Sequence, residues 1–421
     1  MSLAALERLD TRRRRRLLEA IPVARQNAID GARDVTVSEV LARAARRRRY
    51  ELRDTMQHLT ARDRLKGCGR KRVTPEVQVK LGTRGAGYAG LSYCESIWSC
   101  PTCSAVIRSQ RADEIQRAVA SHITGGGGAL FITMTLPHGK KDPLRGLLKQ
   151  VTQGWGKIMN RRSGRDWRDR LGLLGYIRAV EVTHGANGWH PHLHLLVLTE
   201  TPVLSDTRAA FGAWLTSQWV TYTSDRAWKA TGGKWGVDVQ DVTGSDGVTK
   251  YVAKVQDACG SDRVLGSEIS RADLKTGRGR HGKTPFELLS DVTEYRADAT
   301  LVPDGRHERR IGALWREYEE ETAGLSALRW SPGLRDRLDV PEISDAELLA
   351  SVDLGDDVQT VMRIPAADWH VLVVSGQRGR LLDVVETIGP DAARTFVQDT
   401  VLAYLQDWAA AVELAFEDPP D

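Results

Sequence analysis

The 421-residue sequence contains no apolar stretch approaching the roughly 18 residues needed to span a bilayer. The arginines at positions 12–16 are followed by only a short apolar patch, which is not the pattern of a secretory signal. Internal repeats are also absent, so nothing indicates a repeat architecture. We therefore predict a cytoplasmic protein without a membrane segment.

Cysteine is scarce, with only five in the chain, and four of these lie between residues 66 and 105. In a reducing compartment such thiols are better explained as metal ligands or buried side chains than as disulfides. The remaining composition is ordinary for a globular protein, with 41% hydrophobic and 27% charged residues. At roughly 100 to 200 residues per domain, the length suggests two or three domains.

The net charge of +5 conceals a strong asymmetry along the chain. Residues 1–80 carry 21 Lys and Arg against 10 Asp and Glu, whereas residues 341–421 carry 4 against 16. A basic front with an acidic tail is a usual sign of a polyanion partner, because cationic side chains displace the counterions condensed on phosphate. The runs Arg12–Arg16 and Arg46–Arg49 are equally compatible with solvated helix faces or disordered arms.

Composition divides the chain into four stretches. Residues 1–65 favour helix, with partial disorder around the arginine blocks as the alternative. Residues 66–105 hold cysteines among glycines and turn formers and predict a zinc-binding segment. Residues 106–260 alternate helical and strand patterns and carry the His-rich motif. Residues 261–421 predict a mainly helical accessory region with an acidic tail.

Hydrophobic periodicity in the third stretch predicts an α+β fold. The expected strands cover 129–135, 175–183, 189–198 and 235–242, and the expected helices cover 143–159, 206–219 and 247–256. Up to the last strand the order is β-α-β-β-α-β, which gives a ferredoxin-like antiparallel sheet with helices packed on one face. Farther on, the patterns predict a helix over 309–323, a short strand over 369–374 and one or two helices over 389–415.

Three histidines recur with period two in the strand predicted over 189–198. On an extended chain His190, His192 and His194 project from one face, and three such polar groups rarely all find partners in a core. A turn over 184–188 sets Glu181 opposite His192, although a slip of one residue would turn Glu181 to the other face. Imidazoles plus a carboxylate suit a divalent ion that must also hold substrate oxygen.

The spacing Cys94-x5-Cys100-x2-Cys103 includes a Cys-Pro-Thr-Cys turn that is typical of metal sites. No thioredoxin-like pattern surrounds it, so structural zinc is favoured over a redox role and over buried thiols. The preferred fourth ligand is Cys68, in a Gly-rich turn, and the alternatives are His58, His122 and Cys259. The nearby cations expected to contact DNA are Arg70, Lys71, Arg72 and Arg108.

Tyr251 and Lys254 stand at i and i+3 of the helix predicted over 247–256, adjacent on one face. A tyrosine hydroxyl can act as a covalent nucleophile, and a nearby cation favours the phenolate. Such a pair is common by chance. The histidine strand upstream and the β-α-β-β-α-β order favour the interpretation of this pair as catalytic.

Together these features resemble the HUH endonuclease superfamily, and more closely the rolling-circle replication initiators of actinobacterial plasmids. The resemblance covers about residues 66–335. Its matching pieces are Phe131–Thr135, the His192-Leu193-His194 motif within GWHPHLHLLVL, the Tyr251–Lys254 motif, GVDVQ at 236–240, TPFELL at 284–289 and the segment around 330–334.

The resemblance implies metal-dependent nicking and joining of origin DNA. His192 and His194 would hold Mn²⁺ or Mg²⁺, with Glu181 or a neighbouring residue as third ligand and His190 as a further candidate. Tyr251 would attack the scissile phosphodiester, form a 5′-phosphotyrosine and release a 3′-OH primer. The implied partners are single-stranded and duplex origin DNA and a host helicase and polymerase. The C-terminal region is the candidate for origin recognition or self-association.

Some relatives with a single tyrosine carry, four residues before it, a carboxylate that activates water when replication ends. Here Gly247 stands at that position, and Asp246, one residue away, is the candidate. A zinc-stabilised DNA-binding regulator without catalysis is the main alternative function. A conjugative relaxase usually carries its tyrosine before the His motif, and a single-tyrosine transposase is much shorter, so both are disfavoured.

Overall fold

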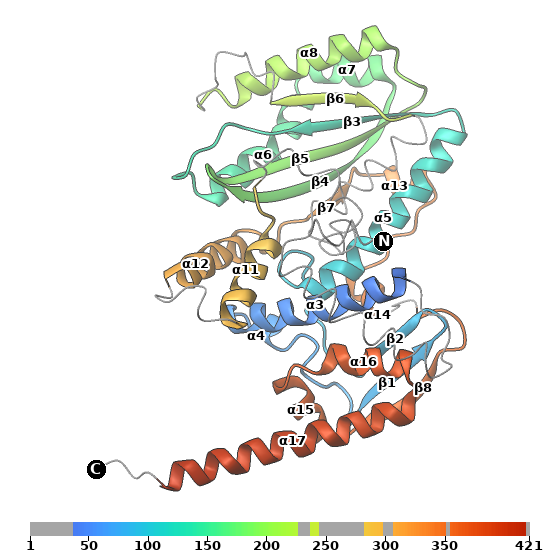
Figure 1. Cartoon of the computed structure of the whole chain (residues 1–421). Helices are drawn as coiled ribbons and strands as arrows, with labels where there is room; N and C mark the ends of the chain where they lie inside the picture. The colour runs from blue at the N-terminus through green and yellow to red at the C-terminus, as the bar shows by residue number, and fades with distance from the viewer. Residues whose placement is uncertain (1–36, 226–235, 244–281, 298–305, 351–353, 418–421) are drawn as a thin grey trace, which may run out of the picture.

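The structure, a computed structural model, describes residues 37–225, 236–243, 282–297, 306–350 and 354–417 (Figure 1). Over these ranges the chain is α+β and contains two antiparallel sheets. The larger sheet lies at the top of Figure 1 and the smaller one at the bottom, with a layer of helices between them. No helix in these ranges is long and apolar enough to cross a membrane.

The larger sheet has the strand order β6-β3-β5-β4-β7, and all neighbouring strands are antiparallel. Its strands are β3 (Gly128–Met134), β4 (Leu173–Gly185), β5 (Gly188–Thr199), β6 (Val237–Asp241) and β7 (Leu328–Trp330). The helices between them are α6 (Leu144–Met159), α7 (Arg162–Leu171) and α8 (Ser205–Tyr222). The elements follow the predicted alternation, with α7 as an additional helix and β7 as a fifth strand from far downstream.

Both faces of this sheet are covered. One set of alternating residues, including Ile132 and Leu195, packs against α6 and α8. The other set, including Phe131 and Leu196, packs against Ile115 and its neighbours in α5 (Pro101–Thr124). The prediction of helices on one face alone is therefore wrong. The 24-residue helix α5 also has an apolar side, and that side must be buried against another element.

The smaller sheet combines two strands from the N-terminal part of the described chain with one strand from its C-terminal part. Its order is β2-β1-β8, formed by β1 (Val77–Gly82), β2 (Gly85–Ala89) and β8 (Gln359–Ile364). Its core includes side chains of α15 (Ala366–Val374), α16 (Arg378–Thr387) and α17 (Pro390–Glu417). The cysteine-bearing segment thus shares a core with the C-terminal region.

The strand predicted over 369–374 is wrong, because these residues form the end of helix α15. A short apolar run cannot by itself distinguish a buried helix from a strand. In the helix, Trp369 and Leu372 are three residues apart, and both are buried in the core of the smaller sheet. The predicted helices over 309–323 and 389–415 correspond to α12 (Arg306–Glu321) and α17.

The layer between the sheets is helical. It is built around α3 (Val37–Leu59), which contacts α5, α12, α16, α11 (Pro285–Ala297) and α4 (Asp63–Lys66). Two short helices, α13 (Leu334–Arg337) and α14 (Asp345–Ala350), lie beside α5 and the larger sheet. Elements distant in sequence therefore hold the two sheets together.

The arginine run of α3 binds the acidic tail of the same chain. Arg46 forms ion pairs of 2.5 Å with Asp383 and with Glu386 of α16, and Arg43 pairs with Glu386 at 3.2 Å. Arg47 pairs with Asp383 as well. Burial would raise the pKa of Glu386, but its contacts with Arg46 lower it. Arg46 and Arg47 are therefore neither a free phosphate contact nor a solvated face, which corrects both interpretations of these residues.

Candidate metal centres

The β4–β5 hairpin has the register that the sequence predicts. Glu181 pairs with His192, and Thr183 pairs with His190. The turn is closed by Gly188 with a φ of 91°, a conformation that side chains other than glycine rarely adopt. Because side chains alternate along a strand, this register places Glu181 on the same face as the histidines.

Glu181 lies between two imidazoles. Its Oε2 is 2.9 Å from Nε2 of His194 and 3.6 Å from Nδ1 of His192. One ligand atom from each of the three residues lies within 4.8 Å of the others, so a single ion can contact all three. His194 is buried, but the side chains of His192 and Glu181 keep 23% and 20% of their surface exposed. The group is thus reachable from solvent.

The electrostatics of this group favour a cation. Burial would raise the pKa of Glu181, but hydrogen bonds and charge from His192 and His194 lower it well below its usual range. Glu181 is therefore a carboxylate at neutral pH. A negative oxygen between two imidazole nitrogens is the donor set of a site for a divalent metal ion.

His190 lies beside this group rather than in it. Its Nδ1 is 3.0 Å from Nε2 of His192, and its Nε2 is 2.5 Å from Oγ1 of Thr135. Its ring also stacks on His138, with the centroids 4.2 Å apart. Burial, together with the charges of His192 and His138, lowers the pKa of His190 to about 3. Both ring nitrogens of His190 contact other side chains, so in this arrangement His190 contacts His192 and is not itself one of the grouped candidate ligands.

Sequence reasoning missed two threonines that contact the histidines from the neighbouring strand. Thr133 pairs with His194 across β3 and β5, and its Oγ1 is 3.2 Å from Nδ1 of His194. Thr135, directly after β3, contacts His190. Their period-two spacing indicates a shared face, but only the pairing of β3 with β5 shows which face it is. A hydrogen bond to the second imidazole nitrogen sets the tautomer and orientation of a ligand histidine.

Replacing Thr133 by Val should weaken Mn²⁺ binding by about 10- to 100-fold, because Val keeps the shape but cannot hydrogen-bond Nδ1 of His194. The matched variant Thr133→Ser keeps the hydroxyl and should bind close to normally. Titration calorimetry or the electron paramagnetic resonance signal of free Mn²⁺ measures both affinities. Wild-type affinity in Thr133→Val would show that this hydroxyl does not orient His194.

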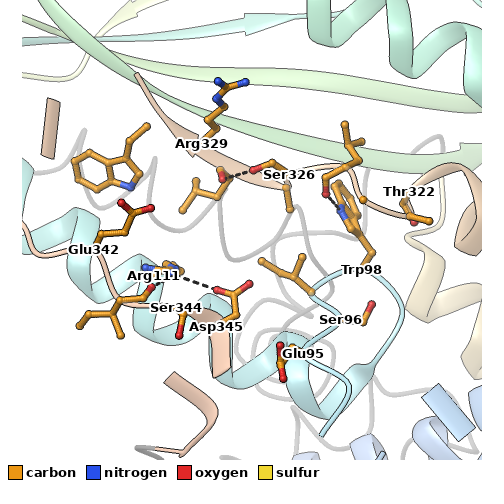
Figure 2. Close-up of a pocket in the computed structure, with 18 of the residues that line it drawn as sticks. Glu95, Ser96, Trp98, Arg111, Thr322, Ser326, Arg329, Glu342, Ser344 and Asp345 are labelled. Atoms are coloured by element: carbon orange, nitrogen blue, oxygen red, sulfur yellow. Dashed lines mark hydrogen bonds and ion pairs between the residues drawn. The ribbon is translucent and has the colours of Figure 1, made fainter. Parts of the chain in front are cut away.

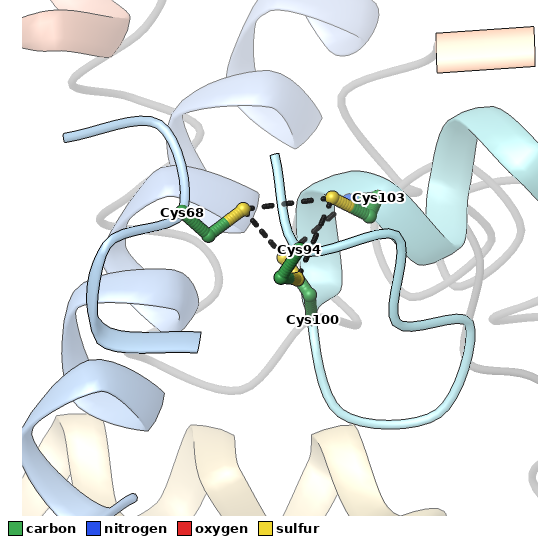
Figure 3. Close-up of side chains that lie close together, drawn as sticks. All are labelled: Cys68, Cys94, Cys100 and Cys103. Carbon is green, nitrogen blue, oxygen red and sulfur yellow. Dashed lines mark hydrogen bonds between the residues drawn. The ribbon is translucent and has the colours of Figure 1, made fainter. Parts of the chain in front are cut away.

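The structure brings four buried cysteines together from separate segments (Figure 3). Cys68 follows α4, Cys94 lies in a loop, and Cys100 and Cys103 begin α5. The sulfur of Cys68 is 3.6 Å from that of Cys100 and 3.5 Å from that of Cys103, and Cys94 is 3.8 Å from Cys103. Thiolates bound at about 2.3 Å to a tetrahedral metal lie about 3.8 Å apart. The cluster can therefore hold a metal ion.

Local structure prepares this cluster. Cys100 is the N-cap of α5, and its sulfur accepts the backbone N–H of Cys103 at 3.5 Å. Burial would raise the pKa of Cys100, but hydrogen bonds from the other three thiols lower it well below its usual value. Hydrogen bonding to Cys100 raises the pKa of Cys94. Several thiolates can coexist here only with a cation between them.

The alternative fourth ligands are placed elsewhere. His122 contacts the carbonyl oxygens of Gly128 and Thr199, at 3.2 and 3.1 Å. His58 is not part of the cysteine cluster. Cys259 lies outside the described residues.

Arg108 is buried, with 4% of its surface exposed, and was predicted to contact DNA. It donates hydrogen bonds of 2.8 Å to Ser104 Oγ and to the carbonyl of Ile97. Burial lowers its pKa to about 10. Its guanidinium fastens the loop before α5 and does not reach the surface, so that prediction is corrected. Of the other three predicted cations, Arg70 and Arg72 are half-buried and Lys71 is exposed.

Tyr251, Lys254 and Asp246 lie within residues 244–281, outside the described residues. The helix predicted over 247–256 lies there too. Their geometry relative to Glu181, His192 and His194, the metal group, is therefore not part of the site as described, and their roles stay predictions.

A pocket of about 1280 Å³ opens between the cysteine loop, the segment around β7 and the start of α14 (Figure 2). Its walls mix both charges. Arg111 pairs with Asp345 at 3.0 Å, and Trp98 donates to the carbonyl of Leu325 at 2.6 Å. Neither Glu181 nor the histidines line it. The pocket is thus separate from the metal group of β4 and β5.

Residues 89–211 match the family model described as Replication protein. This stretch contains Cys94, Cys100 and Cys103 and the whole β4–β5 hairpin. A curated relative, Protein rep of Streptomyces lividans, is 32% identical over 338 residues, which cover 67% of this chain and 73% of that protein. The chain therefore belongs to the replication protein (Rep) family, in its actinobacterial plasmid form.

Two further relatives are more distant or shorter in overlap. Neomycin resistance protein of Streptomyces cyanogenus is 28% identical over 299 residues, covering 61% of this chain and 67% of that protein. Protein rep of Streptococcus pneumoniae is 30% identical over 81 residues, covering 19% of this chain and 24% of that protein. No solved structure matches the chain.

Proposed function

We propose that this protein initiates rolling-circle replication of a plasmid by nicking and rejoining its origin DNA as a single-tyrosine HUH endonuclease. The observation that carries the proposal is the convergence of Glu181, His192 and His194 on one hairpin of a Rep-family chain. Two imidazoles and a carboxylate suit Mn²⁺ or Mg²⁺, and the histidines lean toward Mn²⁺. The ion, when bound, offsets the negative charge of the scissile phosphate.

Tyr251 supplies the nucleophile in this proposal. Its phenolate oxygen bonds to the scissile phosphorus, and the bond from phosphorus to the 3′ oxygen breaks. The 3′ oxygen takes up a proton and becomes the 3′-OH primer, while the 5′ phosphate stays on Tyr251. Lys254, one helical turn along, favours the phenolate. Asp246 is the proposed activator of water at termination, and a host helicase and polymerase extend the primer.

We propose that the cysteine cluster holds structural zinc. The four thiols are buried and spaced as ligands of a tetrahedral ion, and such sites contribute directly to folding. By fastening α4 and the loop before α5, the ion would position the helix that covers the metal-binding face of the larger sheet.

The nucleophile is tested by its covalent product. With Mn²⁺ and single-stranded origin DNA labelled 3′ of the nick, the protein should form an adduct that survives denaturation, and Tyr251→Phe should form none. Tyr222→Phe is the matched control, because the hydroxyl of this tyrosine on α8 donates to the carbonyl of Gln150 and is not among the candidate metal ligands. A normal adduct with Tyr251→Phe would remove Tyr251 from the reaction.

A further inference from the structure

The helix α7 carries a cationic surface that the proposed chemistry does not use. It contains Arg162, Arg165, Arg168 and Arg170 against Asp166 and Asp169. Arg161 directly precedes it, and Lys157 lies near the end of α6. Five of these six cations are exposed, and the sixth, Arg168, is half-buried. This surface is named the α7 cation surface.

These cations have no carboxylate partner within the described part of the chain. Arg165 and Arg168 hydrogen-bond only to Asn160, at 3.2 Å to its carbonyl and 2.7 Å to its Oδ1. Arg170 lies over the ring of Trp167. The arginines of α3 are different, because Arg46 and its neighbours form ion pairs with α16. An arginine helix without carboxylate partners retains its charge for an external anion.

Helix α7 packs closely against its neighbours, so the positions of its cations are fixed. Gly164 is buried, and a Cβ there would lie 2.5 Å from the carbonyl oxygen of Ile158. Trp167 packs against Phe211 of α8 with the ring centroids 5.4 Å apart, and Leu171 is buried. One side of α7 is therefore packed against the rest of the protein, and the arginines project from its other sides.

We propose that the α7 cation surface binds the phosphate backbone of the duplex DNA that flanks the nick. The inference rests on the proposed function, since the DNA concerned is the plasmid origin. Guanidinium groups match phosphate geometry by donating two hydrogen bonds at once. From Arg162 to Arg170 the helix rises about 12 Å, a length over which duplex DNA carries about seven phosphate charges. Such contacts hold the duplex without reading its sequence.

The test is the salt dependence of duplex binding by the full chain. The double variant Arg162→Gln, Arg165→Gln keeps good helix formers at exposed positions and should melt like the wild type. For a duplex origin fragment, its Kd should rise about 10-fold or more, and the slope of log K against log salt should become shallower by about 2, close to one unit per lost phosphate contact.

The matched control is Arg145→Gln, Arg394→Gln, which removes two charges already paired with Glu321 and Asp391. It should leave the slope at the wild-type value. An unchanged slope in the α7 variant, or an equal change in both variants, would overturn the proposal. Adduct formation on a short single strand that covers only the nick should be normal in the α7 variant. Because duplex binding is read without nicking, failure of the Tyr251 chemistry would not obscure the result.

Discussion

His194→Ala is expected to reduce nicking by about a thousandfold or more while duplex binding stays near normal. A metal ion that offsets phosphate charge contributes several kcal/mol to the transition state, and each 1.36 kcal/mol is about tenfold in rate. His194 is 2.9 Å from Glu181 and is hydrogen-bonded to Thr133, so its loss removes a proposed ligand that two neighbours orient. Nicking assays over a range of Mn²⁺ concentrations measure the effect.

The matched control for His194→Ala is His184→Ala. His184 lies in the same hairpin, with its ring against Trp189, but outside the group of candidate ligands. The His184→Ala variant should nick DNA at the wild-type rate. Equal loss of nicking and duplex binding in His194→Ala would indicate a role in folding or binding. Lost nicking with unchanged Mn²⁺ affinity would remove His194 from the metal group.

Cys100→Ser is expected to release one tightly held metal ion and to unfold the segment around α4 and the start of α5. Structural zinc sites contribute apparent free energies of about 10 to 16 kcal/mol in small domains, which is comparable with the whole stability of a typical protein. Cys100 also caps α5, so its sulfur would serve both the proposed ion and the helix. Metal analysis of the purified protein and thermal melting measure the two consequences.

Cys259→Ser is the matched control for the cysteine cluster, since Cys259 is the one cysteine outside the described residues. It should retain one equivalent of zinc and melt like the wild type. Complete absence of a bound metal from the wild-type protein would contradict the proposed zinc site. Retention of the ion in Cys100→Ser would show that Cys100 is not an essential ligand.

Much of the metal group could be predicted because it is local in sequence. Glu181 and His192 are separated by one tight turn, and a hairpin turn sets the register of its two strands. The alternation of histidines states which side chains share a face. Thr133 could not be assigned in this way, because it lies some sixty residues upstream in a strand whose neighbours no local pattern specifies.

The same limit explains the errors. The opposite face of the larger sheet is covered by α5, and the periodicity of the strands does not say which helix lies where. The apolar run at 369–374 fits a strand or a buried helix equally well until its surroundings are known. Arg108 and Lys71 are both cations close to cysteines in the sequence, which does not show that Arg108 is buried beneath a loop and that Lys71 is exposed.

The amino-acid sequence alone therefore determined the features whose partners are close along the chain. These are the histidine strand, Glu181 across one turn from it, and the turn that carries Cys100 and Cys103. Tertiary structure alone decided what depends on distant segments, namely the pairing of β1 with β8 and the contact of the Thr133 hydroxyl with His194. It also decided which arginines remain available, because Arg46 and Arg47 of α3 pair with carboxylates of α16 whereas the arginines of α7 meet no carboxylate among the described residues. Short-range geometry follows from backbone periodicity, but the neutralisation of a charge depends on which segments the fold brings into contact.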